Sequence, residues 1–177
     1  MKYVALLRGI NVGGNSMVKM ADLKESLKEN GFKNVATYIN SGNVILESDK
    51  SDQENLTKEI EELLSKRFGF ELRIVLRNHV QMKRVVEGVP HDWNTRTDLR
   101  YYIAFIKEPV TVGEAFAEVE PRKDVDFIEK GPGVIYMATL WTDITKSGIA
   151  KLIGKKIYKE MTMRNYNTTK KILSLME

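Results

Sequence analysis

The sequence contains no cysteine, and this absence excludes several classes of chemistry. Disulfides, thiolate zinc sites, iron–sulfur ligation and cysteine nucleophiles all need a sulfur atom that the chain does not supply. With only two histidines, we also expect no metal site. A chain without cysteine fits a reducing cytoplasm, which is the compartment that we expect. The sequence leaves the question of a cofactor open.

Long apolar segments are also lacking. No run of about 18 apolar residues occurs, so we expect no membrane-spanning helix and no membrane partner. A predicted strand follows Met1 at once, and we therefore expect no secretion signal. Hydrophobic residues make up 42% of the chain and charged residues 29%, which is ordinary for a folded protein. At 177 residues the chain is long enough for one domain or two small ones.

Positive charge is concentrated near the C-terminus. Residues 145–177 hold eight basic and two acidic residues, a net charge of +6, whereas the remainder holds 20 basic and 22 acidic residues, a net charge of −2. Such a basic face attracts phosphate-bearing partners through its long-range field. The structural alternative is that these lysines form the solvated faces of two amphipathic helices.

The first half of the chain alternates strand and helix patterns. A near-continuous apolar run at residues 2–8 predicts a central strand buried on both faces, and a loop rich in glycine and asparagine follows it. Helical spacing of Met20, Leu23 and Leu27 predicts a helix that ends near Gly31. Further predicted elements are a hairpin of strands 35–40 and 43–47, a helix with Ser51 as N-cap and Glu54 completing a capping box, a strand at 72–77, and a short helix from Asn78, capped with Gln81.

The second half follows the same plan. The predicted elements are a strand at 101–107, a helix opened by a capping box at Thr111 and Glu114, strands at 124–130 and 134–141, a helix at 149–157, a short fourth strand at 161–164, and a helix at 168–176.

These patterns predict an α+β protein of two tandem ferredoxin-like (βαββαβ) subdomains with mixed or antiparallel sheets. We expect an N-terminal subdomain at residues 1–88, a linker loop at 89–99, and a C-terminal subdomain with a closing helix at 100–177. The two halves share their element order without evident similarity of residues. A single merged sheet is the alternative.

Four blocks of the sequence carry a family resemblance: YVALLRGINVGG at 3–14, MADL at 20–23 with GF at 31–32, TYINSGNV at 37–44, and RNYNT at 164–168. Together they resemble a bacterial family of uncharacterised proteins, the family of domain of unknown function 1697. The resemblance implies the paired ferredoxin-like architecture and no established activity. Asn15 stands where the family usually has a basic residue, and Tyr166 where it usually has tryptophan.

The first candidate site is the glycine loop. Gly9 and Gly14 with Asn15 and Ser16 have the spacing of a phosphate-binding P-loop, but Asn15 replaces the essential lysine, so we do not favour a nucleoside triphosphatase. Adjacent glycines still allow backbone N–H groups to form an anion-binding nest. The candidate ligand residues here are Arg8, Gly9, Asn11, Gly13 and Gly14. The alternative is a tight loop that merely needs glycine.

Other candidate ligand residues come from three further stretches. Arg164, Asn165, Asn167 and Thr168 gather polar donors at a predicted helix start, with Asn167 or Thr168 as N-cap. Lys146 and Ser147 stand at the start of the preceding helix. Ser41 and Asn43 flank the predicted hairpin turn. For each stretch an ordinary cap or turn is the structural alternative.

One acidic pair is interpreted as structural. Asp124 and Asp126 are two residues apart on a predicted strand, so they would share one face. With Val125 and Phe127 pointing inward, we expect both carboxylates on the solvated face of the sheet rather than around a cation.

We therefore expect a module that binds a phosphorylated small molecule or a nucleic acid through the glycine loop and the basic C-terminal face. In this hypothesis the glycine loop and the turn at 164–169 meet around the bound anion. The sequence does not decide whether the protein is an enzyme. Two alternatives stay open: a small-molecule enzyme with a polar cleft between the halves, and a homo-oligomeric interaction protein.

Overall fold

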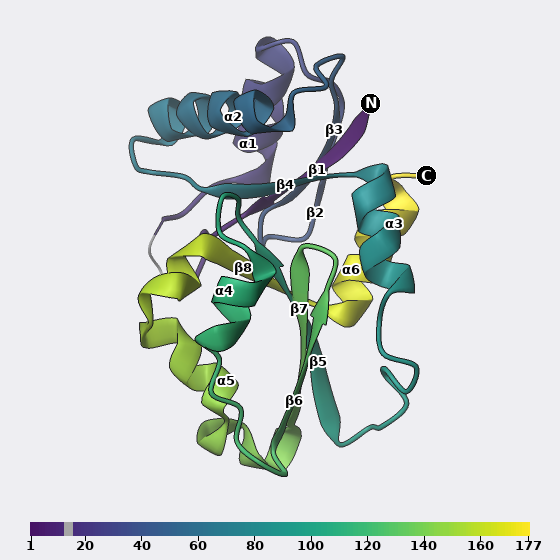
Figure 1. Ribbon diagram of the computed structural model, residues 1–177. Helices are drawn as coiled ribbons and strands as arrows, with labels where there is room; N and C mark the ends of the chain where they lie inside the picture. Colours follow the sequence, from purple (N-terminus) through teal and green to yellow (C-terminus); the bar gives the residue numbers. More distant parts are fainter. Residues whose placement is uncertain (13–15) are drawn as a thin grey trace. The chain divides into compact units, whose positions relative to one another are not determined.

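The computed structural model describes residues 1–12 and 16–177 (Figure 1). The chain divides into two compact units: an N-terminal unit of Met1–Met82 with Ile172–Glu177, and a C-terminal unit of Lys83–Lys171. The boundaries of these units fall inside helices, and the domain limits expected from the sequence stay a prediction. Among the described residues, no helix combines the length and the apolar character that crossing a bilayer requires.

The N-terminal unit has the predicted ferredoxin-like order of elements. These are β1 (Lys2–Leu7), α1 (Met20–Glu29), β2 (Lys33–Tyr38), β3 (Asn43–Glu47), α2 (Gln53–Phe68) and β4 (Ile74–Asn78), followed by α3 (His79–Glu87). The four strands form one sheet in the order β2-β3-β1-β4, with every neighbouring pair antiparallel. Strand β1 therefore lies between β3 and β4, the central position that its apolar run predicts.

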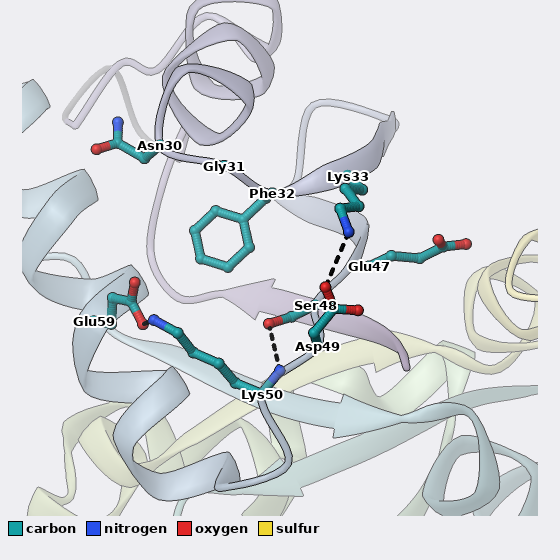
Figure 2. A pocket seen from close by; sticks show the side chains of 9 residues that line it. All are labelled: Asn30, Gly31, Phe32, Lys33, Glu47, Ser48, Asp49, Lys50 and Glu59. Carbon is teal, nitrogen blue, oxygen red and sulfur yellow. Dashed lines mark hydrogen bonds and ion pairs between the residues drawn. The ribbon is translucent and has the colours of Figure 1, made fainter.

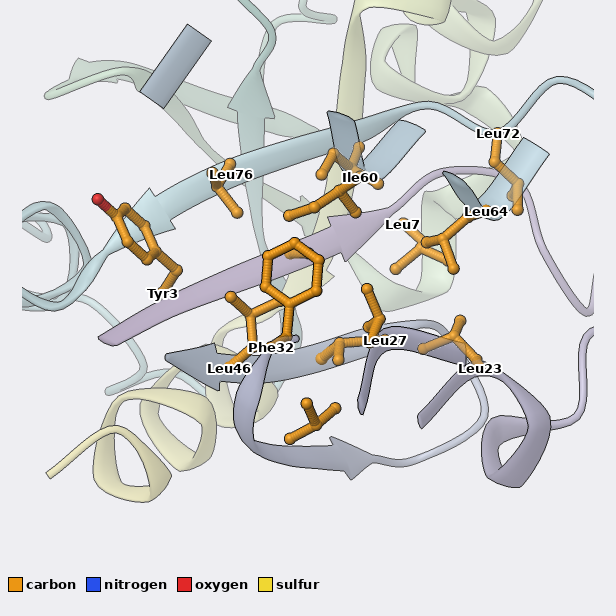
Figure 3. Close-up of a cluster of buried hydrophobic side chains, with 14 of the residues drawn as sticks. Tyr3, Leu7, Leu23, Leu27, Phe32, Leu46, Ile60, Leu64, Leu72 and Leu76 are labelled. Carbon is orange, nitrogen blue, oxygen red and sulfur yellow. The ribbon is translucent and has the colours of Figure 1, made fainter. Parts of the chain in front are cut away.

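Alternate side chains of β1 form the core of this unit. Tyr3 and Leu7 point toward helices α1 and α2, where they join Leu27 and Ile60 in one buried cluster (Figure 3). Val4, on the opposite face of β1, is also fully buried, so both faces of the strand are excluded from water. Burial of such side chains contributes roughly 1.5–3 kcal/mol each, and it fixes the strand whose end carries the candidate site.

The C-terminal unit repeats the topology. Its elements are β5 (Leu99–Ile106), α4 (Val112–Ala117), β6 (Asp126–Gly131), β7 (Val134–Leu140), the 3-10 helix η1 (Trp141–Lys146), α5 (Gly148–Lys151), the 3-10 helices η2 (Leu152–Gly154) and η3 (Lys156–Glu160), β8 (Met161–Asn165) and α6 (Tyr166–Leu175), which extends into the first unit. The sheet order β6-β7-β5-β8 matches that of the first unit, and its pairs are antiparallel. The chain thus forms two four-stranded sheets, not one merged sheet, and belongs to the α+β class.

Pairing registers reveal a similarity of residues between the halves that the sequence pattern alone does not show. Tyr3 of β1 pairs with Asn78 of β4, and Tyr102 of β5 pairs with Asn165 of β8. In each unit an arginine precedes that asparagine and pairs with the residue after the tyrosine, as Arg77 with Val4 and Arg164 with Ile103.

Backbone hydrogen bonds at the end of the first strand repeat in the same way. The N–H of Leu7 donates to the carbonyl of Gly42 at 2.8 Å, and the N–H of Ile106 donates to that of Gly133 at 3.1 Å. The two halves are therefore one supersecondary unit built twice, and they differ in the loops that the shared scaffold carries.

Helix caps are only partly as the sequence predicts. Asn78 and Gln81 exchange reciprocal hydrogen bonds of 2.9 Å, and the capping box at Thr111 is present, so both predictions are confirmed. Ser51 is not an N-cap. Helix α2 begins one residue later, and Asp52 accepts the N–H of Asn55 at 3.1 Å, because a carboxylate at that position complements the helix N-terminus.

Two connections also differ from prediction. The hairpin strands pair up to Tyr38 and Asn43, so the turn spans residues 39–42 instead of Ser41-Gly42 alone. The single helix expected at 149–157 is a short α-helix followed by two 3-10 helices. It breaks where Lys155 takes an extended conformation after Gly154, a residue of low helix propensity.

The prediction that Asp124 and Asp126 share the solvated face of one strand is wrong. Asp124 lies before β6 with a left-handed φ of 61°, whereas Asp126 is buried and Phe127 is 43% exposed. Asp126 tolerates burial because its carboxylate accepts three hydrogen bonds, from the hydroxyl of Ser147 and the N–H groups of Gly148 and Arg122. Burial raises the pKa of Asp126, but these bonds outweigh it and hold the pKa below its ordinary value.

We expect Asp126→Asn to lower the free energy of unfolding at pH 7 by about 1–3 kcal/mol, because the amide nitrogen would face buried donors. Because the pKa of Asp126 is lower in the folded state, its contribution is complete above the ordinary value of 3.8 and is lost as the pH falls through the lowered pKa. The difference between the variant and the wild type should therefore narrow in acid.

Urea unfolding at pH 7 and pH 3 measures this, with the exposed Asp124→Asn as the matched control. Equal stabilities of the two variants at pH 7 would contradict the assignment.

Candidate functional site

The end of β1 is held on both sides by its neighbours. The N–H of Leu7 donates to the carbonyl of Gly42 in the β2–β3 turn, and the N–H of Arg8 donates to the carbonyl of Arg73, which precedes β4, at 2.9 Å. Arg8 is half-buried at this position, at the start of the loop that leads to α1. The strand end thus presents Arg8 and Gly9 between two other segments of the same unit.

Asn11 joins the glycine loop to the β2–β3 turn. Its side-chain nitrogen donates to the carbonyl of Asn40 at 2.8 Å and to that of Val18 at 3.0 Å, and its side-chain oxygen accepts the N–H of Val18 at 2.8 Å. Its own N–H donates to the carbonyl of Ser16 at 3.2 Å. One amide side chain therefore fixes both ends of the glycine loop and ties them to the turn. We call the exposed surface of residues 8–12, 16–19 and 39–41 the loop site.

Left-handed backbone conformations are concentrated here. Gly9, Asn11, Ser16, Ile39 and Gly42 have φ values of 67°, 56°, 52°, 50° and 78°. For Ile39 this is a true outlier, since a branched Cβ opposes the conformation. Non-glycine residues in such conformations cost about 1–3 kcal/mol each and cluster at functional sites. The hydrogen bonds of Asn11 connect the segments that take these conformations.

The loop site exposes both apolar and polar side chains. Val12, Met17 and Ile39 are 69%, 71% and 49% exposed, an unusual gathering for large apolar residues. Asn40 and Ser41 are exposed beside them. Asn43 is buried, and its amide donates to the hydroxyl of Ser41 at 3.1 Å and to the carbonyl of Tyr38 at 3.0 Å. Asn43 thus supports the turn from below, while Ser41 faces outward.

Of the residues predicted from the sequence, the structure brings five together here: Arg8, Gly9, Asn11, Ser41 and Asn43. Gly13 and Gly14 lie outside the described residues. The sequence analysis missed Val18 and Asn40, whose backbone groups complete the hydrogen bonds of Asn11. Asn40 falls inside the TYINSGNV block, but the partner of a backbone carbonyl cannot be deduced from such a block. That the five predicted residues bind a ligand stays a prediction.

The predicted residues at the end of β8 belong to the other unit. Arg164 is 7% exposed and donates from Nη1 to the hydroxyl of Thr162 at 2.8 Å and to the carbonyl of Met163 at 2.9 Å. Burial lowers the pKa of Arg164 to about 10. The anion expected to join this stretch to the glycine loop stays a prediction.

The prediction that Asn167 or Thr168 is the N-cap of the last helix is wrong. Helix α6 begins at Tyr166, and Asn165 accepts the N–H of Asn167 at 2.9 Å. Asn165 acts as the cap because it is the last residue of β8, where the chain is still extended and its side chain can reach back to the first turn.

Lys146 and Ser147 serve contacts within the C-terminal unit. Lys146 forms an ion pair with Asp143 at 2.7 Å. Ser147 is 2% exposed, accepts the N–H of Ile149 as the N-cap of α5, and donates to Asp126. Ser147 has the role of a structural cap, and binding of a ligand by these two residues stays a prediction.

A pocket of about 150 Å³ lies at the opposite end of the first sheet (Figure 2). Its lining includes Phe32 and two ion pairs, Lys33 with Asp49 at 2.9 Å and Lys50 with Glu59. None of the candidate ligand residues predicted from the sequence lines this pocket. Both lysines of the pocket are paired with carboxylates, which weakens their attraction for an added anion. Within the described residues, no group of acidic or histidine side chains is placed to hold a metal ion.

Comparisons with known proteins identify a family and assign no activity. The family model described as "Protein of unknown function (DUF1697)" matches residues 1–136. A solved structure, that of the conserved bacterial protein SP0830 from Streptococcus pneumoniae, superposes with a TM-score of 0.88 at 27% identity, over 99% of this chain and 98% of that one. No curated protein matches the chain. The matched residues include the whole loop site.

We expect Gly42→Ala to destabilise the N-terminal unit by about 2 kcal/mol or more. At φ +78° an added Cβ would lie 2.7 Å from Leu7 Cβ and 2.8 Å from Ile10 Cδ1, so steric overlap adds to backbone strain. Gly31→Ala is the matched control, because Gly31 has φ +87° with no atom within 4 Å of the added Cβ and should lose only about 1–2 kcal/mol.

Denaturant unfolding of both variants separates the cost of backbone strain from the cost of steric overlap. Equal losses would show that the turn does not pack against the end of β1 as described.

Proposed function

Because the chain belongs to DUF1697, a family without an assigned function, we propose its function from the loop site: binding of a phosphorylated small molecule by the N-terminal unit. The observation that carries this proposal is the set of hydrogen bonds of Asn11, which stabilises strained loops on an otherwise regular scaffold. The proposed compartment is the cytoplasm, where phosphorylated metabolites are abundant.

The repeated architecture supplies an internal comparison. In the C-terminal unit the chain passes from β5 to α4 through residues 107–111, and from β6 to β7 through 132–133. In the N-terminal unit the corresponding connections are residues 8–19 and 39–42. Both scaffolds form the same hydrogen bonds at the strand end, so the fold does not require the longer loops. Extra loop length that the scaffold does not need favours a ligand-binding role.

The charge of the loop site suits an anion. Residues 8–19 and 39–43 contain Arg8 and Lys19 and no acidic residue. Lys19 is the N-cap residue of α1, and in the described part of the chain its side chain forms no capping hydrogen bond. The first-turn N–H groups of α1 therefore follow the loop without a side-chain cap, at the positive end of a ten-residue helix. A phosphate group would complement both features.

The apolar side chains point to an organic group beside the phosphate. Val12, Met17 and Ile39 each neighbour a residue that takes part in the Asn11 hydrogen bonds, so all three lie around the same loops. Asn40 and Ser41 are exposed polar residues in the same turn. This mixture fits a nucleotide or a sugar phosphate better than free inorganic phosphate, because a bare ion would leave the apolar surface exposed.

We expect calorimetric titration with ATP, AMP, ribose 5-phosphate and inorganic phosphate to find binding of at least one of the organic phosphates. Arg8→Gln should then weaken it roughly 10- to 100-fold, because charge-assisted hydrogen bonds contribute about 1.5–3 kcal/mol. Asn11→Asp keeps the acceptor for Val18 but loses both donated bonds, and it should also weaken binding.

Lys28→Gln, an exposed substitution on α1, is the matched control for charge and should bind like the wild type. Equal binding by Arg8→Gln and Lys28→Gln, or no binding of any of the four compounds, would contradict the proposal.

A further inference from the structure

A large aromatic side chain of the C-terminal unit is half exposed. Trp141, directly after β7, is 53% exposed. Its backbone is fixed, because its N–H donates to the carbonyl of Asp98 at 2.9 Å. The guanidinium of Arg100, from β5, lies over its ring, 4.1 Å from the centroid. The indole is thus held by a rigid strand end and stacked with a cation, while half of its surface faces solvent.

A second pair of the same kind occurs in this unit. Phe127 of β6 is 43% exposed, and Arg96 lies over its ring at 5.7 Å from the centroid. Arg96 is held by Asp98, which accepts two hydrogen bonds from the guanidinium. In contrast, Trp93, the other tryptophan, packs against Tyr101, Tyr136 and Tyr166 in an aromatic cluster. Aromatic burial is therefore available in this unit, and Trp141 does not use it.

Positive charge continues along the chain from Trp141. Residues 141–160 contain five lysines against two carboxylates, and Figure 1 shows this stretch as a series of short helical turns along one side of the unit. Lys146 pairs with Asp143, and Arg122 adds to the positive field at the same carboxylate. Lys151, Lys156 and Lys159 are exposed along this stretch. These lysines do not lie on one regular helix, because residues 148–160 form a short α-helix followed by two 3-10 helices. Ile149 and Leu152 of this stretch are buried, whereas Ile153 is 67% exposed.

We propose that the C-terminal unit binds single-stranded nucleic acid, with Trp141 as the stacking platform for an unpaired base and with Lys151, Lys156 and Lys159 as phosphate contacts. This site lies in a different unit from the loop site and does not rest on the proposed function. A cation-backed indole recognises the flat face of a base, which a lipid headgroup or a phosphopeptide lacks. Lysines spread along this stretch of short helices can contact successive phosphates of a nucleic-acid backbone.

Fluorescence anisotropy of labelled (dT)12, (rU)12 and a 12-base-pair duplex at about 50 mM salt tests the inference. We expect wild-type protein to bind at least one single strand more tightly than the duplex, and the comparison of (dT)12 with (rU)12 separates DNA from RNA. Trp141→Ala should weaken single-strand binding roughly five-fold or more, since a stacked base contributes on that order. Lys28→Gln serves as the matched control and should bind like wild type.

Two further variants sharpen the test. Arg100→Gln keeps Trp141 but removes the stacked cation, and it should also lose affinity. A combined Lys151→Gln, Lys156→Gln and Lys159→Gln variant should reduce the slope of log affinity against log salt by up to about 2, because each phosphate contact in a single strand contributes about 0.7. Tryptophan fluorescence gives an independent readout: (dT)12 should quench the wild type and leave the Trp141→Ala variant, which retains Trp93, unquenched.

Equal binding by Trp141→Ala and Lys28→Gln, equal or tighter binding of the duplex, or no binding of any oligonucleotide would overturn the inference. Asn11→Asp should bind oligonucleotides like the wild type, and Trp141→Ala should bind organic phosphates like the wild type. A protein that binds an organic phosphate but no oligonucleotide would overturn this inference alone. The reverse outcome would contradict the loop-site proposal alone.

Discussion

The hydrogen bonds of the Asn11 side chain are the interaction on which the loop site depends. They connect the chain that leaves β1, the chain that enters α1, and the β2–β3 turn. These bonds help to offset the cost of the left-handed conformations at Asn11, Ser16 and Ile39. The rigid core around β1 supplies the fixed base from which these bonds act, because a strand buried on both faces cannot shift to relieve strain in the loop.

Repetition of one supersecondary unit explains how such a site can exist in a small protein. Both units secure the end of the first strand through the same backbone hydrogen bonds, and in both a tyrosine of the first strand pairs with an asparagine of the fourth. Once the scaffold is stable in each, loops can vary without loss of the sheet. In the N-terminal unit this freedom appears as long, strained loops. In the C-terminal unit the corresponding two connections are short, and the variation appears in the short helices between β7 and β8 and in the exposed Trp141.

Some features that depend on local sequence are predictable, although the N-caps expected at Ser51 and at Asn167 or Thr168 are wrong. Thr111 and Glu114 form their capping box because both partners lie within one turn, and the apolar run of β1 predicts a central strand. The burial of Asp126 could not be predicted in this way, since two of its hydrogen-bond donors come from Ser147 and Gly148, far away in the sequence. The same reasoning applies to the loop site. Glycine and asparagine indicate an unusual backbone, but the bond between Asn11 and Asn40 is a tertiary contact. The similarity of Arg77-Asn78 to Arg164-Asn165 became evident only from strand register.

The most direct test of the central claim is a nuclear magnetic resonance titration of isotopically labelled protein with ATP and ribose 5-phosphate. The account predicts that the backbone amides of residues 8–12, 16–19 and 39–43 shift first and most, while those around the pocket at Lys33 and Lys50 stay in place. Shifts confined to that pocket, or none at saturating ligand, would contradict it.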